Sequence, residues 1–257
     1  MKKKTLIIII AACVVVALAA VAIICIVSNK KEDKPVLTMG TNAAFPPYEY
    51  YENDKIVGID AEIAAAIAEK MGYTLEIKDM DFDTLVPSVA AGKIDFSMAG
   101  MTVTEARLQS VFFSTSYAKG VQAIIVPEGS PITTVDDLYA EGAAYKVGVQ
   151  EGTTGDIYCS DDFGEELVFK YKNGAEAVAS MVAGKLDCVI IDNNPAKAFV
   201  DANEGLVLLE TSYADEDYAA AISYDDPELC EKFNAAINDL ISDGTIAAIL
   251  NKYIPAE

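Results

Sequence analysis

Hydrophobic and polar positions alternate in short runs along residues 35–257, and these runs predict strands and helices in turn. Runs rich in apolar and β-branched residues predict strands at residues 36–39, 74–78, 94–98, 121–126, 146–149, 167–171, 186–191, 207–209 and 218–223. Apolar residues at helical spacing predict helices at residues 60–71, 82–91, 175–183, 227–242 and 245–253. Such alternation is typical of an α/β fold with mainly parallel sheets.

One short segment occurs twice. Residues 91–95 read Ala-Gly-Lys-Ile-Asp and residues 183–187 read Ala-Gly-Lys-Leu-Asp, each between a predicted helix and a predicted buried strand. Ala-Gly-Lys alone is ordinary for a turn from helix to strand. Polar residues follow both strands, however, and ligands of open α/β sheets bind beyond the carboxyl ends of strands. The repetition therefore favours two sheets in two lobes over one large sheet.

The amino end differs from the rest of the chain. Three lysines precede an uncharged run at residues 5–27, and polar residues return at 28–34. About 20 apolar residues suffice to cross a bilayer, and the preceding lysines place the remainder of the chain on the outer side. We predict that residues 1–34 are an uncleaved membrane anchor with a short linker. Lipidation at Cys13 or Cys25 and plain secretion are the alternatives.

Composition excludes several functions. Asp and Glu number 40 against 19 Lys and Arg, a net charge of −21, so nucleic acid is a poor partner. The chain has no histidine, which removes Ser-His-Asp and Cys-His nucleophiles and histidine-bound zinc. We predict no catalytic residue, no metal ligand and no cofactor. Cys159, Cys188 and Cys230 cannot all pair within the chain, and we predict buried free thiols.

Arg107 is the only arginine of the chain, beside 18 lysines. A guanidinium group can hold a carboxylate at two points, which lysine cannot do, and Arg107 follows the predicted strand at 94–98 together with Thr102. The alternative is a surface arginine beside a helix cap. Thr153 and Thr154 stand where a helix opens after another strand, and N–H groups at such an end suit a carboxylate.

Asp192 ends the strand at 186–191, where it can pair with an ammonium group or simply cap a helix. Residues 41–51 form a proline-containing aromatic loop after the first strand, and its Phe45 can wall a small pocket with Phe82. The alternative is that both phenylalanines are edges of the core. A carboxylate clamp, an ammonium partner and aromatic walls together suit a free α-amino acid.

Ordered motifs over nearly all of residues 35–257 resemble the family 3 solute-binding proteins of polar amino acid ABC transporters. They are GTNAAFPPYEY at 40–50, VGID at 57–60, MDFDTLVP at 80–87, GKID at 92–95, GMTVTEAR at 100–107, GVQEGTT at 148–154 and ID at 191–192. The resemblance implies a periplasmic-binding-protein-like fold of type 2. Residues 35–118 plus 214–257 would form lobe 1 and residues 119–213 lobe 2, joined by two hinge segments around one amino acid.

The resemblance also implies a role for each candidate residue. The α-carboxylate would be held by Arg107, Thr102 and the amides at Thr153 and Thr154; the α-ammonium by Asp192, Thr102 and the Gly100 carbonyl. Phe45 and Phe82 would flank the ligand side chain, whose far end Asn42 and Gln150 would meet. The partners implied are the permease of an ABC importer and the membrane through the anchor, with the binding protein itself a monomer on the outer face.

One departure from the family concerns specificity. Many members carry Asp where this chain has Asn42, and in those that bind basic amino acids the carboxylate helps to neutralise the ligand side chain. Asn42 cannot do so, and we therefore predict a neutral or amide-bearing ligand such as glutamine. Two other functions stay open: a sensing module that signals through a partner, and a dehydratase-like enzyme on the same fold.

Overall fold

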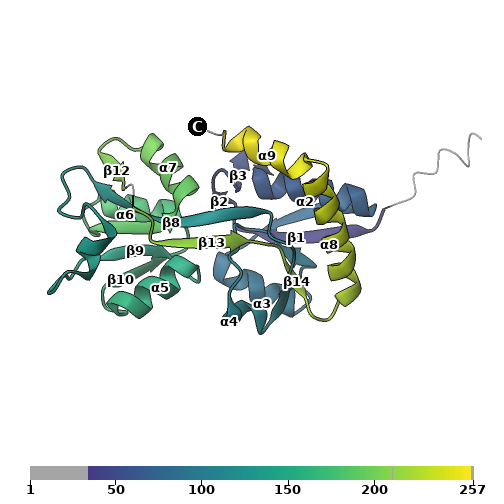
Figure 1. Cartoon of the computed structure of the whole chain (residues 1–257), viewed down its shortest axis with the longest axis horizontal. Helices are drawn as coiled ribbons and strands as arrows, with labels where there is room; N and C mark the ends of the chain where they lie inside the picture. Colours follow the sequence, from purple (N-terminus) through teal and green to yellow (C-terminus); the bar gives the residue numbers. More distant parts are fainter. Residues whose placement is uncertain (1–33, 210, 256–257) are drawn as a thin grey trace, which may run out of the picture. The chain divides into compact units, whose positions relative to one another are not determined.

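The computed structural model describes residues 34–209 and 211–255. The predicted anchor, with Cys13 and Cys25, lies outside the described residues except for Lys34. Within the described ranges, no helix is long and apolar enough to cross a membrane. The residues from Val36 onward form one unit with two sheet-containing lobes (Figure 1).

The first sheet has the strand order β5-β1-β6-β14-β7. Its strands are β1 (Val36–Thr41), β5 (Thr74–Asp79), β6 (Phe96–Ser97), β7 (Val111–Phe113) and β14 (Ala221–Ser223). Strand β1 pairs in parallel with β5 and β6, whereas β14 pairs antiparallel with β6 and β7. The accompanying helices are α2 (Ile59–Met71), η1 (Phe82–Thr84), α3 (Leu85–Ala90), α4 (Glu105–Leu108), α8 (Pro227–Ser242) and α9 (Thr245–Tyr253).

The second sheet has the order β10-β9-β11-β8-β12, and β13 also pairs with β8. Its strands are β8 (Ala118–Pro127), β9 (Val147–Gln150), β10 (Val168–Tyr171), β11 (Cys188–Asp192), β12 (Leu206–Leu208) and β13 (Ala214–Tyr218). Strand β9 is parallel to β10 and β11, whereas β8 is antiparallel to its neighbours. The helical segments here are η2 (Val135–Tyr139), α5 (Thr154–Phe163), α6 (Gly174–Val182) and α7 (Asn193–Ala202).

Both sheets are therefore mixed, and the strands that connect the lobes explain why. Parallel pairs arise where a helix returns the chain to the same end of a sheet. Strands β8 and β13 instead run side by side between the two lobes in opposite directions (Figure 1). We propose that these crossing strands are the hinge, with lobe 1 at residues 35–118 plus 214–257 and lobe 2 at 119–213.

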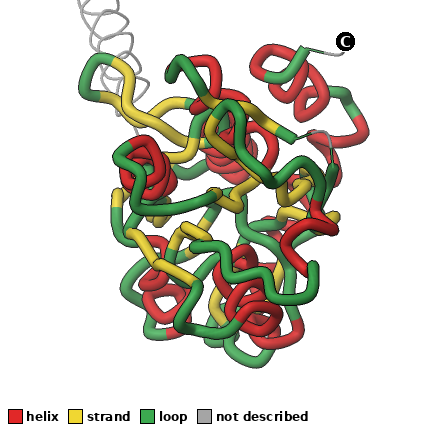
Figure 2. The backbone as a smooth tube through the Cα atoms, turned by 90° about the vertical axis from the view of Figure 1, so that its left-hand side faces the viewer, coloured by secondary structure: helices red, strands yellow, loops and turns green. Residues whose placement is uncertain are grey.

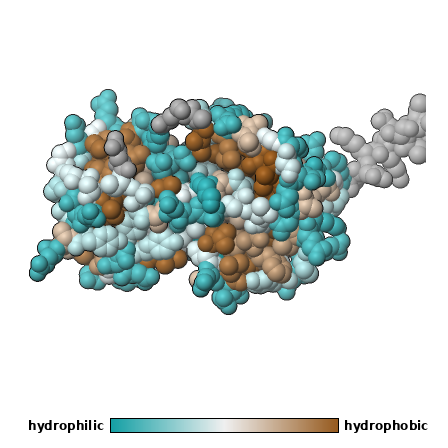
Figure 3. All heavy atoms as spheres, in the orientation of Figure 1, coloured by the Kyte–Doolittle hydropathy of each residue, from teal (hydrophilic) through white to brown (hydrophobic). Residues whose placement is uncertain are grey.

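Apolar side chains between sheets and helices form the cores, and Figure 2 shows helices around the central strands. In lobe 1, Phe96 packs against Phe233 of α8, with ring centroids 5.0 Å apart. In lobe 2, Cys159 and Cys188 are wholly buried in a core with Ile190, and burial raises the pKa of the Cys188 thiol to about 12. On the face in Figure 3, hydrophobic residues gather in separate patches bordered by hydrophilic ones.

A small sheet of β2 (Ala44–Phe45), β3 (Glu49–Glu52) and β4 (Lys55–Val57) forms where the sequence predicted only an aromatic loop. Asn53 and Asp54 connect β3 to β4 with φ angles of 49° and 61°. Two central residues with positive φ are typical of a type I′ hairpin turn, and Asn and Asp tolerate this conformation. Asn53-Asp54 was therefore the signal for a hairpin. Within this small sheet, Glu49 of β3 is wholly buried.

Candidate ligand-binding site

A pocket with about 400 Å³ of empty space, counting the part that is open to solvent, is lined by residues of both lobes and the hairpin. The structure brings together in it all ten residues predicted from the sequence: Asn42, Phe45, Phe82, Gly100, Thr102, Arg107, Gln150, Thr153, Thr154 and Asp192. Among the residues described, no cluster of three or more His, Cys, Asp or Glu side chains is suited to hold a metal ion. The polar groups available to a ligand are thus a guanidinium, carboxylates, amides and hydroxyls.

Arg107 occupies one end of the pocket and is 9% exposed. It lies on α4, whose first residues are capped by the Thr104 hydroxyl, which accepts from the Arg107 amide at 3.2 Å. Its Nη1 donates to the Thr102 carbonyl at 2.6 Å and its Nη2 to the Gly152 carbonyl at 3.0 Å. The guanidinium stacks 5.4 Å from the Phe82 ring centroid. The unique arginine therefore contacts both lobes.

The start of α5 faces the same end of the pocket. The Thr153 hydroxyl caps this helix by accepting from the Asp156 amide at 3.3 Å. Thr154 is 2% exposed, and its Oγ1 lies 3.5 Å from Oγ1 of Thr102 in the other lobe. The first N–H groups of a helix lack partners within it and favour anions. This end of the pocket is thus suited to a carboxylate.

Asp192 lies at the end of β11 and is 1% exposed. Its Oδ2 accepts from the Tyr218 hydroxyl at 2.6 Å and the Val121 amide at 3.0 Å, and its Oδ1 accepts from the Asn194 amide at 3.1 Å. Burial raises the pKa of this carboxyl to about 6 against the opposing effect of these donors. Asp192 thus caps α7 and lines the pocket at once, so the two interpretations of the sequence are compatible.

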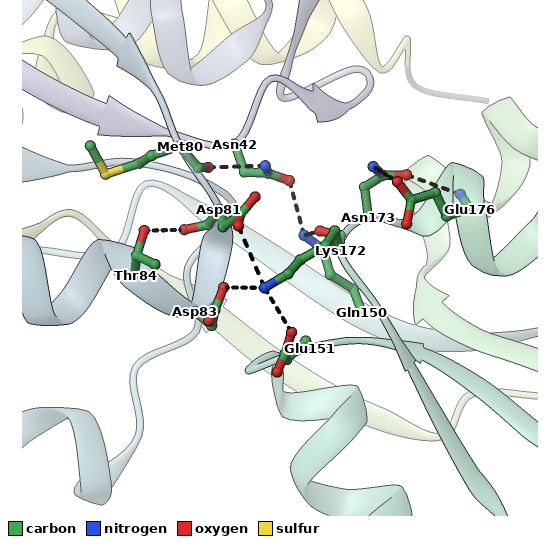
Figure 4. A network of polar contacts seen from close by, with 10 residues as sticks. All are labelled: Asn42, Met80, Asp81, Asp83, Thr84, Gln150, Glu151, Lys172, Asn173 and Glu176. Carbon is green, nitrogen blue, oxygen red and sulfur yellow. Dashed lines mark hydrogen bonds and ion pairs between the residues drawn. The ribbon is translucent and has the colours of Figure 1, made fainter.

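Two amide side chains meet at the other end of the pocket (Figure 4). Gln150 Nε2 donates to Asn42 Oδ1 at 2.9 Å and to the Lys172 carbonyl at 3.3 Å, while Asn42 Nδ2 donates to the Met80 carbonyl at 3.0 Å. Beside them, Lys172 Nζ of lobe 2 lies between three carboxylates. These are Asp81 and Asp83 of lobe 1, at 3.4 and 3.6 Å, and Glu151, at 2.9 Å.

Phe45 and Phe82 form aromatic walls of the pocket, and both are buried. Gly100 lies against Phe45 with a φ of 52°, and a Cβ there would come within 2.8 Å of the Phe45 ring. This position therefore requires glycine for both its conformation and its space.

The sequence-based prediction missed six lining residues: Glu49, Ala99, Gln122, Ile191, Glu216 and Tyr218. Gln122 is buried, and it is a lone polar residue within the otherwise apolar predicted strand at 121–126, which was a usable signal. Its Nε2 donates to Glu216 Oε2 at 2.9 Å. Glu216 and Tyr218 are two positions apart on β13 and therefore lie on the same face of the strand. The predicted strand began only at Tyr218, so this pattern was not recognised.

The two lobes and the pocket between their sheets define a type 2 periplasmic binding protein. In agreement, the model of the bacterial extracellular solute-binding proteins, family 3, matches residues 37–256. The chain belongs to this family. The predicted fold class and the resemblance stated from the sequence motifs are confirmed, and at the level of the family the function is solute binding and not catalysis.

Several relatives agree with this assignment. The arginine-binding extracellular protein ArtP of Bacillus subtilis is 32% identical over 239 residues, 90% of this chain and 90% of ArtP. The ABC transporter glutamine-binding protein GlnH of the same organism is 30% identical over 234 residues, 89% of this chain and 85% of GlnH. A solved ancestral arginine-binding protein bound to glutamine is 36% identical with a TM-score of 0.81, covering 87% of this chain and 99% of its own.

Proposed function

We propose that this protein captures a free L-amino acid outside the cytoplasm and delivers it to the permease of an ABC importer. It would act as a monomer held on the outer face of the membrane by its amino-terminal segment. One observation carries the proposal: a single guanidinium and the Asp192 carboxylate line one pocket, which the two lobes share. An α-amino acid carries the two complementary charges on adjacent groups.

The α-carboxylate is assigned to Arg107, Thr102 and the first amides of α5. Arg107 and Thr102 come from lobe 1 and the helix from lobe 2, so a ligand held by all of them favours the closed arrangement of the lobes. The α-ammonium is assigned to Asp192, Thr102 and the Gly100 carbonyl. Phe45 and Phe82 cover the ligand side chain.

The ligand side chain is proposed to be neutral and to carry an amide, as in glutamine. Its far end meets Asn42 and Gln150, which offer amide donors and acceptors but no charge. An acidic side chain is disfavoured because Arg107 is already assigned to the α-carboxylate. The solved relative with bound glutamine supports a pocket of this kind accepting an amide.

Arginine is the second candidate, and two observations favour it. The ArtP relative is named as an arginine-binding protein. In this chain Glu216 lines the pocket at 6% exposure, and its Oε1 has no hydrogen-bond partner among the described residues. With Asp192 and Glu49, this gives the pocket three carboxyl groups against one guanidinium, a balance that suits a ligand of net positive charge.

A thermal-shift screen of the purified protein against the common L-amino acids, followed by calorimetry, tests the proposal. A ligand at a hundred times its Kd stabilises the folded state by about 2.7 kcal/mol, which such a screen detects. We expect glutamine to bind more tightly than arginine or lysine, and Asn42→Asp to shift the preference toward arginine. A Kd for arginine below that of every neutral amino acid would contradict the amide proposal and favour the second candidate.

Silence across the whole panel would contradict capture of a common L-amino acid. It would favour a modified amino acid or the dehydratase-like alternative.

A further inference from the structure

Two neighbouring carboxyl groups are buried at the pocket. Glu49 of the hairpin strand β3 and Asp60 in the first turn of α2 are both 0% exposed. Their side chains are within hydrogen-bonding reach of each other. Glu49 lines the pocket, and Asp60 stands behind it. Neither group has a role in the proposed contacts with the ligand.

The two carboxyl groups differ in the donors that reach them. Asp60 Oδ2 accepts from the Gly100 amide and from the Tyr117 hydroxyl, both at 2.8 Å. Within the described part of the chain, no donor reaches Asp60 Oδ1 or either Oε atom of Glu49. Three buried carboxyl oxygens therefore have no hydrogen-bond donor. Burying a polar atom without a hydrogen bond is strongly unfavourable.

The surroundings of Glu49 are acidic. Across from it lie Asp60 on α2, Asp79 on β5 and Asp192 on β11, and these charges all disfavour ionisation of Glu49. The neighbouring tyrosines are Tyr48, on the turn before β3, and Tyr117, which is bound to Asp60. A single proton removes most of the conflict: a carboxyl O–H on Glu49 can donate to the free Asp60 Oδ1, which leaves one Glu49 oxygen without a donor, and Asp60 stays ionised for Gly100 and Tyr117.

We propose that Glu49 is a positioning residue of the binding site, which stays protonated at neutral pH, donates a hydrogen bond to Asp60, and through Asp60 holds Gly100 in place. Gly100 lies after β6, and its carbonyl is assigned to the ligand ammonium. The proton on Glu49 would therefore set the geometry of a group that the ligand contacts.

The directions of the pKa shifts of the two carboxyl groups agree with this assignment. Burial, and next the Asp60 charge, hold the pKa of Glu49 well above its ordinary value of 4.5. Burial raises the pKa of Asp60 to about 6, opposed by its bonds with Gly100, Tyr117 and Glu49. Because two donors stabilise ionised Asp60 and none reaches Glu49, Glu49 is the member of the pair that is assigned the proton.

NMR of the full-length protein labelled with ¹³C at the glutamate carboxyl carbon tests the protonation without any ligand. At pH 7 we expect one glutamate resonance at the position of a protonated acid, lost in Glu49→Gln and kept in Glu62→Gln. Glu62 is the matched control on α2, because its exposed carboxylate pairs with Lys252 and its pKa is lowered by these bonds. Absence of a protonated glutamate in the wild type at pH 7 overturns the proposal.

Unfolding measured against pH gives the second readout. Unfolded Glu49 ionises above about pH 4.5, whereas folded Glu49 keeps its proton, so unfolding releases a proton and rising pH favours it. Over the range in which folded Glu49 keeps its proton, from about pH 5.5 to neutral pH, the unfolding constant of the wild type, relative to Glu49→Gln, should rise about tenfold per pH unit. A constant ratio between the two proteins contradicts a protonated Glu49.

Ligand affinity distinguishes a positioning role of Glu49 from an effect on stability alone. Of the three experiments, this one rests on the proposed function. L-glutamine and L-arginine are the probes, and affinities are compared for whichever of them binds the wild type. In Glu49→Gln the amide can still donate to Asp60, whereas Glu49→Leu leaves Asp60 Oδ1 unpaired, so we expect about tenfold weaker binding in the leucine variant. Equal affinities of these two variants overturn the positioning role. If neither probe binds the wild type, the proposed function fails, while the NMR and unfolding results still decide the protonation.

Discussion

The repeated Ala-Gly-Lys segment forms the same local structure in both lobes, but different residues follow the strand after it. In lobe 1, Asp95 donates its amide to the Thr38 carbonyl at 3.0 Å and accepts from the Thr38 amide at 2.6 Å. In lobe 2, Asp187 makes the same pair of bonds with Lys146, at 2.9 and 2.7 Å. Each aspartate ties the start of its strand to the neighbouring strand, so the two scaffolds are locally equivalent.

The difference lies beyond the strands. In lobe 1 the chain continues to Gly100, Thr102 and the buried Arg107, whereas β11 of lobe 2 ends at the buried carboxylate of Asp192. Equivalent scaffolds thus offer groups of opposite charge to one pocket. We infer that the few residues after each strand determine the chemistry, while the shared segment only places them. Substitutions at these residues and at the contact between the lobes test this division of roles.

Replacing Arg107 with lysine should weaken the grip of the pocket on the ligand carboxylate. Lysine keeps the charge but cannot reproduce the planar fork, nor the bonds to both the Thr102 and Gly152 carbonyls. We expect affinity for the bound amino acid to fall about a hundredfold, as measured by calorimetry. Thermal unfolding without ligand controls for a loss of fold. Unchanged affinity in a folded variant would show that Arg107 is not a two-point clamp.

Replacing Asp192 with asparagine should weaken the opposite end. The amide oxygen can still accept from the Asn194 amide, but the charge facing an ammonium group is lost. We expect about thirtyfold weaker binding of the amino acid, and a much smaller change for its deaminated analogue. An equal loss for both compounds would mean that Asp192 acts on the fold and not on the ammonium group.

Affinity should also depend on pH through Asp192. Its pKa is raised to about 6 by burial, and an ammonium ligand binds the ionised form. Binding should therefore be constant above pH 7 and weaken as the pH falls through 6, approaching tenfold per pH unit. Calorimetry between pH 4.5 and 8 measures this, with Asp192→Asn as the control that flattens the profile. The same acid loss in that variant would assign the titration elsewhere.

Lys172 and Lys170 provide the smallest test, of the contact between lobes. Lys172 pairs across the lobes with Asp81 and Asp83, whereas Lys170 pairs within lobe 2, with Asp156 and Glu165, each at 3.0 Å. Exposed pairs are weak, so Lys172→Gln should speed ligand dissociation only about threefold, and less at high salt. Stopped-flow dissociation should show no such effect in Lys170→Gln. Equal rates in both variants would remove Lys172 from the closure of the lobes.

Local patterns predicted most elements, because apolar periodicity and helix ends are properties of neighbouring residues. The helices at 227–242 and 245–253 have the bounds expected, and the two sheets follow the predicted alternation. The hairpin around Asn53 was missed because its strands are only 4 and 3 residues long, too short for a pattern to emerge. Antiparallel pairing of β8 was equally beyond local pattern, since its partner β13 is distant in the chain.

Ordered motifs and strand ends are local features of the chain, and they were enough to predict the class of fold, the family and ten candidate residues. That Gln122 and Glu216 line the same pocket as Arg107 and Asp192 follows from the fold alone, because crossing strands bring them from distant segments. It alone placed Glu49 against Asp60. Charge at these buried positions depends on the groups that surround each one in space, and no spacing along the chain encodes that neighbourhood.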